Sequence, residues 1–358
     1  MSDDASGSSL AEKGLQGQDQ TVASFEEQGR NGIRRVQHFL HEYPTAIPFL
    51  VLVFGVLVFA GVAGHRFYAP FNLSLVLQQV TIIATLGIAE TLVILTAGID
   101  LSVGAIMILS SIVMGRFAVV YGVPIAIAFP LGLLTGIVCG LINGLLVAVV
   151  KLPSFIVTLG TWSVYGALVI YVSDSETVRS QDIQNIAPML QWTGNIIKIG
   201  GGAVITLGAV LMIAVALAIW YLLNWTAFGR HIYAAGDDPE SARLAGINTR
   251  NTLIGVYTLA GFICALAGWI IIGRIGAASP LAGQDANLDA ITAVVIGGTS
   301  LFGGRGSILG TILGALIVGV FRNGLALAGL DSLWQEFTVG ILIIVAVTID
   351  QWIRKISA

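Results

Sequence analysis

Residues 75–97 read LVLQQVTIIATLGIAETLVILTA, a nearly continuous apolar run that contains a single charged residue, Glu90. A helix that crosses the hydrocarbon core of a bilayer needs about 20 consecutive, mainly apolar residues, so this run predicts a membrane-spanning helix. The whole chain has the same character, because 56% of its 358 residues are apolar and only 10% are charged. Soluble domains carry about 25% charged residues. We therefore predict an all-α, polytopic membrane protein.

Apolar segments of similar length recur along the chain and predict about ten transmembrane helices. They lie at 47–64, 75–97, 103–121, 123–150, 155–172, 203–223, 252–272, 288–302, 308–328 and 333–350. The eighth segment is short and rich in glycine, so it could be a broken or re-entrant helix buried among the others. Eight or nine crossings remain alternatives.

The distribution of Lys and Arg predicts that both chain ends lie in the cytoplasm, where loops of membrane proteins carry an excess of these residues. With ten crossings, the cytoplasmic segments hold Arg30, Arg34, Arg35, Lys151, Arg230, Arg243, Arg250, Arg305, Arg354 and Lys355. The external segments hold only Arg66, Arg116, Arg179, Lys198 and Arg274.

The predicted domain organisation follows from these segments. Residues 1–46 form a cytoplasmic tail, disordered at first and then a short helix on the membrane surface. Residues 47–350 form the transmembrane domain, and residues 351–358 form a cytoplasmic C-terminal tail. The longest external loop, at about 173–202, is either a docking site for an external partner or a solvated connector.

The longest polar connection on the cytoplasmic side is residues 228–251, FGRHIYAAGDDPESARLAGINTRN. The stretch combines a helix start signal with a helix stop signal, and an ordinary loop needs neither. We predict a short helix of about two turns, lying parallel to the membrane. A structured loop with no partner is the alternative.

The start and stop signals of this helix are specific residues. Asp237 or Asp238 can cap its N-terminus, Pro239 suits its first turn, and Glu240 is positioned for a capping box. Gly246 then provides the stop.

Polar residues within the second apolar segment are candidates for the lining of a translocation pathway. Gln78, Thr81 and Thr85 form a stripe beside the face that Gln79 and Glu90 share, because successive residues of a helix are about 100° apart. Hydrogen bonding between packed helices is the alternative for the stripe, and we favour a structural role for Glu90.

Four further polar residues lie in or beside apolar segments. Asp100 can cap the third helix. Asn143 and Asn323 each precede a glycine and can bond to a neighbouring helix. Arg322 lies near the external end of its segment, where a long side chain can extend to the interface, and an electrostatic gate is the alternative.

Four motifs, in order along the chain, resemble those of one family. ESARLAG, which contains Glu240, Ala242 and Gly246, resembles the EAAxxxG coupling loop of ABC-importer permeases, with Ser241 in place of an alanine. With the preceding GRHIYAAGDD it is similar to the loop of ribose, xylose and galactose permeases. The other three motifs are LTAGIDLSVGAIM (95–107), LPSFIVTLGT (152–161) and VVIGGTSLFGGRGSILG (294–310). The resemblance marks Asp100, in the first of these, as a signature residue, which is the alternative to its role as a helix cap. The stretches HEYPTAIPFL and GDDPE look closest to fructose-import permeases.

The resemblance implies a permease subunit, with no enzymatic activity of its own, in the inner membrane of a bacterium. Two permease copies, commonly identical, would enclose the pathway, two ATP-binding subunits would bind below, and a periplasmic protein would deliver a monosaccharide of the fructose or ribose type. Glu240 would fix the N-terminus of the coupling helix, Ala242 would permit close contact, and Gly246 would let the chain turn back.

Cofactor use is expected only in the partners, where the ATPase would use ATP and Mg. A phosphate-binding loop needs Gly-Lys followed by Ser or Thr. None of the four lysines is followed by Ser or Thr, namely Lys13, Lys151, Lys198 and Lys355, so this chain is not expected to hydrolyse ATP through such a loop. No metal site and no nucleic-acid partner are expected, and membrane lipid surrounds the chain.

Two alternative functions remain. A branched-chain amino-acid permease of the same class would need charged groups for its cargo, and a gradient-driven secondary transporter would need several ionisable groups at mid-membrane. The apolar segments offer little beyond Glu90.

Overall fold

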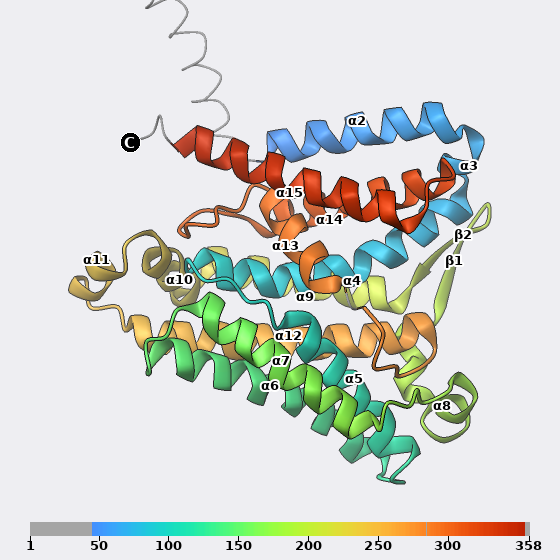
Figure 1. The fold of residues 1–358 in the computed structure, drawn as a ribbon, viewed down its shortest axis with the longest axis horizontal. Coiled ribbons are helices and arrows are strands. Elements are labelled where there is room, and N and C mark those ends of the chain that lie inside the picture. The colour runs from blue at the N-terminus through green and yellow to red at the C-terminus, as the bar shows by residue number, and fades with distance from the viewer. Residues whose placement is uncertain (1–44, 284, 355–358) are drawn as a thin grey trace, which may run out of the picture.

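The computed structural model describes residues 45–283 and 285–354. It is a bundle whose long helices run roughly along one direction (Figure 1). Its elements in chain order are α2 Ala46–Ala63, α3 His65–Tyr68, α4 Pro70–Leu95, α5 Val103–Val119, α6 Ile125–Ala148, α7 Ser154–Ser173, α8 Ser180–Ile186, the 3₁₀ helix η1 Pro188–Gly194, β1 Ile196–Gly200, β2 Ala203–Thr206, α9 Leu207–Trp225, α10 Ala227–Asp237, α11 Pro239–Leu244, α12 Thr249–Ile275, α13 Ala286–Ile296, α14 Ile308–Leu327 and α15 Ser332–Arg354.

Each of the ten predicted segments contains a helix. Seven helices of the described chain are long and apolar enough to cross a membrane, namely α2, α4, α6, α7, α9, α12 and α14. Three shorter apolar helices, α5, α13 and the Ser332–Thr348 part of α15, account for the other segments. The predicted all-α, polytopic membrane fold is confirmed.

Helix α13 is too short to cross a bilayer. Its 11 residues extend about 16 Å at 1.5 Å per residue, whereas the hydrocarbon core is about 30 Å thick. The chain then continues through a glycine-rich turn to α14. The eighth predicted segment is therefore a half-length helix. It packs tightly on α14, because a Cβ atom at Gly314 would overlap the carbonyl of Ala293.

Helix α12 packs against α4, α5 and α6, and α4, α5 and α12 themselves are largely buried. The outer helices carry large apolar side chains on the surface. Examples are Phe54 and Leu57 on α2, and Ile344 on α15. An exposed apolar surface of this kind is the side that a membrane protein turns to lipid.

The bundle has two different ends (Figure 1). Helices α10 and α11 lie at one end, together with the start of α2 and the end of α15. At the other end lie α3, α8 and the antiparallel hairpin of β1 and β2, in which Ile196 pairs with Thr206. The hairpin, α8 and η1 show that the predicted loop at 173–202 is largely ordered, which its sequence did not indicate.

The predicted domain boundaries stay predictions. Helix α2 begins at Ala46, and α15 continues to Arg354, past the predicted boundary at residue 350. The predicted tail and surface helix before residue 45 lie outside the described residues, as does the segment 355–358.

Candidate functional site

The short helix predicted within residues 228–251 is α11, and it is preceded by a second helix, α10, that was not predicted. Asp238 caps α11. Its Oδ1 accepts from the backbone N–H groups of Glu240 at 3.0 Å and Ser241 at 3.1 Å. Its Oδ2 accepts from the Ser241 hydroxyl at 2.5 Å. These hydrogen bonds, that from the Ser241 hydroxyl above all, favour the carboxylate and lower the pKa of Asp238.

Of the two predicted caps, the structure has Asp238, and the predicted capping box is wrong. Asp237 is the last residue of α10 and does not cap α11. Glu240 forms no capping box, because Pro239 takes the first helical position and Glu240 the second, one short of the position from which a side chain reaches back. The Asp238 N–H instead donates to the carbonyl of Ala234 at 3.2 Å, and Glu240 lies 4.0 Å from Arg243.

The C-terminal end of α11 forms a Schellman motif. The Gly246 N–H donates to the Arg243 carbonyl and the Ile247 N–H to the Ala242 carbonyl, both at 3.0 Å. Gly246 has a φ of 87°, a left-handed conformation that glycine adopts without steric cost. Ala242 is buried, whereas Leu244 is 81% exposed. The outer face of α11 is therefore open to a partner, and Ala242 packs inward.

Helix α10 joins α11 to the interior of the bundle. It packs on α4, α9 and α12. The Tyr233 hydroxyl donates to the Gly306 carbonyl at 3.0 Å, and the Gly304 N–H donates to the carbonyl of Leu95, the last residue of α4, also at 3.0 Å. Helix α10 thus bonds to the turn that follows α13, this turn bonds to the end of α4, and Gly236 of α10 also lies against the Leu95 carbonyl.

A cavity of about 760 Å³ lies among α4, α12, α13, α14 and α15. Two of the predicted pathway residues, Gln78 and Asn323, line it, together with Gln79 and residues that the sequence did not single out. Its polar and charged lining residues are Gln78, Gln79, Arg274, Ser279, Asp285, Asp289, Arg322, Asn323 and Gln335.

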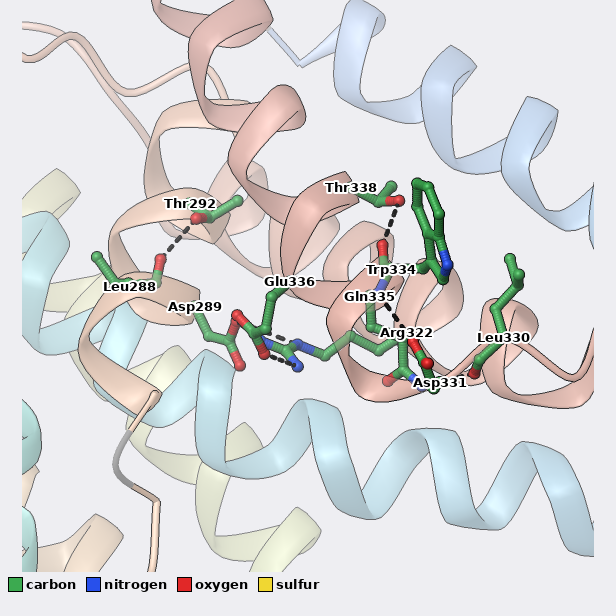
Figure 2. A network of polar contacts seen from close by, with 10 residues as sticks. All are labelled: Leu288, Asp289, Thr292, Arg322, Leu330, Asp331, Trp334, Gln335, Glu336 and Thr338. Carbon is green, nitrogen blue, oxygen red and sulfur yellow. Dashed lines mark hydrogen bonds and ion pairs between the residues drawn. The ribbon is translucent and has the colours of Figure 1, made fainter.

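Arg322 joins three helices at this cavity (Figure 2). It contacts Asp289 of α13 and Glu336 of α15, each at 2.7 Å. Only 18% of the Arg322 side chain and 11% of the Asp289 side chain are exposed. Arg322 therefore forms two ion pairs within the bundle, the one with Asp289 largely buried and the one with Glu336 partly exposed. The extension of this side chain to the interface stays a prediction. Asp289 could have been noticed as an ionisable residue within an apolar segment.

Asn323 contacts a neighbouring helix, as its position predicted. The side-chain amides of Asn323 and Asn72 of α4 exchange two hydrogen bonds of 2.9 Å, and both residues are buried. This reciprocal pair leaves Asn323 at the cavity wall but commits its amide to helix packing.

Glu90, Asp100 and Asn143 lie together, away from the cavity. Glu90 is fully buried, and its Oε1 accepts from the Asp100 N–H at 3.1 Å. Asp100 accepts from both the N–H and the hydroxyl of Ser102, whose hydroxyl also accepts from the Asn143 amide at 2.8 Å. These contacts order the turn before α5.

Asp100 does not cap α5, because its carboxylate bonds to Ser102, the residue before the helix, and to none of the helical N–H groups. The Gly104 N–H donates instead to Oδ1 of Asn287 on α13, at 2.5 Å. This contact joins residues 183 positions apart, which no local pattern could indicate.

The other stripe residues use their hydroxyls within α4. Thr81 donates to the Leu77 carbonyl and Thr85 to the Thr81 carbonyl, each at 2.7 Å. Both threonines are buried. Along the described chain, no three His, Cys, Asp or Glu side chains gather as metal ligands would, and Cys139 and Cys264 are buried free thiols.

Comparison with known proteins identifies the family. Residues 72–347 match the family described as branched-chain amino acid transport system / permease component. The chain is 54% identical to the fructose import permease protein FrcC of Rhizobium meliloti, over 97% of this chain and 96% of that protein.

More distant relatives agree with this match. The ribose import permease protein RbsC of Bacillus subtilis is 40% identical over 87% of this chain and 93% of its own, and the D-allose transport system permease protein AlsC of Escherichia coli is 35% identical over 88% and 94%. No solved structure matches the chain. The chain therefore belongs to this family of transport-system permease components.

Proposed function

We propose that this permease imports a monosaccharide of the fructose or ribose type, as the membrane subunit of an ATP-driven ABC importer in the bacterial inner membrane. The observation that carries the proposal is the 54% identity to a fructose import permease along nearly the whole of both chains. Relatives at 40% and 35% identity are named for ribose and allose import.

This pattern favours sugar over a branched-chain amino acid. The family description refers to amino-acid transport. The individual relatives at 54%, 40% and 35% identity are named for the transport of sugars. These relatives are named as permease proteins of import or transport systems, which favours one subunit of a multi-component importer over a gradient-driven secondary transporter.

We place the ATPase partner, which would use ATP and Mg, at α11. Its outer face is exposed, its N-terminus is capped by the Asp238 side chain and its C-terminus by backbone hydrogen bonds. A helix capped at both ends can transmit a force without unfolding. Arg230, Arg243, Arg250 and Arg305 lie on or next to α10 and α11. By the positive-inside rule this end, with both chain termini, faces the cytoplasm.

Movement of α11 would reach the pathway through α10. Because Tyr233 and the turn at Gly304 tie α10 to the end of α4 and to the turn after α13, a displacement of α11 moves two walls of the cavity together. Gln78 lies on the α4 wall and Asn323 on α14, and both line the cavity. They are the predicted residues that we place in the pathway. Glu90, Asp100 and Asn143 serve the fold around α5.

The opposite end of the bundle, with α8 and the β1–β2 hairpin, would receive a periplasmic sugar-binding protein. A second copy of the permease would complete the pathway, as in a homodimer. The remaining apolar surface, such as that of α2, would face lipid.

Uptake of labelled fructose, ribose, xylose and galactose tests this proposal. Cells with the complete transport system, with and without this chain, are compared after the ion gradients have been collapsed and ATP maintained. We expect chain-dependent uptake of fructose or ribose that survives the collapse. Uptake that disappears with the gradients would establish a secondary transporter, and the uptake of none of these sugars would refute the proposed cargo.

A further inference from the structure

The cavity among α4, α12, α13 and α14 has the size and charge of a site for a small neutral solute. Its volume of about 760 Å³ falls in the range of roughly 300–1,000 Å³ that is usual for small-molecule sites. Its charged lining residues are two arginines, Arg274 and Arg322, and two aspartates, Asp285 and Asp289. These formal charges balance, so the lining as a whole favours neither an anion nor a cation.

Gln79 lines the cavity with an unused acceptor. Its Oε1 is buried, and no donor within the described chain bonds to it. A buried acceptor without a donor is costly and is rare enough in folded proteins to need an explanation. A hydroxyl donor on a solute that enters the cavity would explain it.

Asp289 of α13 provides a second acceptor at the cavity. The Nε of Arg322 at 3.2 Å and its Nη2 at 2.7 Å both contact Oδ1 of Asp289. No hydrogen bond within the described residues uses Oδ2, which is therefore open to another donor. Because Arg322 also holds Glu336, the carboxylate of Asp289 is fixed in place before any solute arrives.

We propose that the permease itself contains a hydroxyl-recognition subsite, in which Gln79 Oε1 and Asp289 Oδ2 accept hydrogen bonds from a neutral polyhydroxylated solute. Two acceptors match the hydroxyl donors of such a solute, and the balanced charges of the lining give no net attraction to an anion or a cation. The inference rests on the proposed import of a monosaccharide and assigns part of the specificity to the pathway, in addition to the binding protein.

Monodeoxy analogues of fructose test the subsite in proteoliposomes that contain the complete importer. For the wild type and Gln79→Leu, initial uptake is measured for fructose and for each analogue with the same binding protein. The ratio of fructose uptake to analogue uptake is then compared between the two variants, so that the preference of the binding protein affects both ratios equally. We expect Gln79→Leu to lower fructose uptake about tenfold, the effect of losing roughly 1.4 kcal/mol, and to abolish the wild-type preference for fructose over one particular analogue.

Thr258→Val is the matched control, since the Thr258 hydroxyl bonds only to the Ile254 carbonyl in its own helix and lies outside the cavity. It should leave all the ratios unchanged. Should Gln79→Leu fail to accumulate, Asp289→Asn, which replaces one acceptor oxygen by a donor, is measured in the same way, and a changed ratio for one analogue is expected. Wild-type ratios in every accumulating variant would overturn the subsite, whereas absence of wild-type fructose uptake would instead refute the proposed cargo.

Discussion

Helices α11 and α13 are both short, but they are held in opposite ways. Helix α11 is fixed at each end by hydrogen bonds between residues no more than five apart, from the Asp238 cap to the Ile247–Ala242 bond. Helix α13 depends on residues far away in the sequence, such as Arg322, 33 positions from Asp289. A locally capped helix can stand exposed and meet a partner, whereas a helix held by distant contacts moves only when its neighbours move.

The largest effect is expected from Arg322→Gln, which breaks the attachment of α13. Removing one member of a buried ion pair destabilises the folded protein by about 3–5 kcal/mol. Because Arg322 and Glu336 are partly exposed, we expect a loss of stability near the lower end of this range. Thermal unfolding in detergent should occur at a markedly lower temperature, and uptake should fall. The double variant Arg322→Gln, Asp289→Asn should recover part of the stability. If the single variant unfolds like the wild type, the ion pairs do not hold α13.

The packing of α13 on α14 provides the next test, through one substitution at two glycines. Gly314→Ala places a methyl group against the Ala293 carbonyl, and overpacking of this kind costs about 1–3 kcal/mol. Gly160→Ala is the control, because nothing lies within 4 Å of the added Cβ atom. Thermal unfolding should separate the two variants. Equal stability would contradict the close approach of α13 and α14.

At α11 the expected effect is on function more than on assembly. Gly246→Val introduces a β-branched residue at a φ of 87°, which costs roughly 1–2 kcal/mol locally, although the space around Gly246 is open. Membrane insertion should be normal and uptake lost. Gly246→Asn is the control, since asparagine tolerates the left-handed conformation, and it should retain most of the uptake. Normal uptake by Gly246→Val would refute the coupling role.

Glu90→Gln is expected to have the smallest effect. The amide keeps an oxygen that can accept from the Asp100 N–H, so the turn before α5 retains its long-range contact. Uptake and insertion should stay near the wild-type level. Complete loss of uptake with normal assembly would show that the carboxyl group itself has a transport role.

The predictions from sequence succeeded for features with a short range. The ten apolar segments all contain helices, and Asp238, Pro239 and Gly246 mark the start and end of α11, because caps depend on adjacent residues. Helix α10 was missed, since its polar residues resemble a loop until its packing on α4 and α12 is known. The predicted pathway stripe does not share one environment, because Gln78 lines the cavity whereas Thr85 is buried in the core.

The membrane class, the helical segments and the capped helix of this protein were determined by its amino-acid sequence, because hydrophobicity and helix caps act over one helix or less. The cavity, the Asp289–Arg322–Glu336 ion pairs and the Asn287–Gly104 contact were decided by the tertiary structure. Each of them joins side chains from separate helices, and which helices become neighbours depends on the packing of the whole bundle.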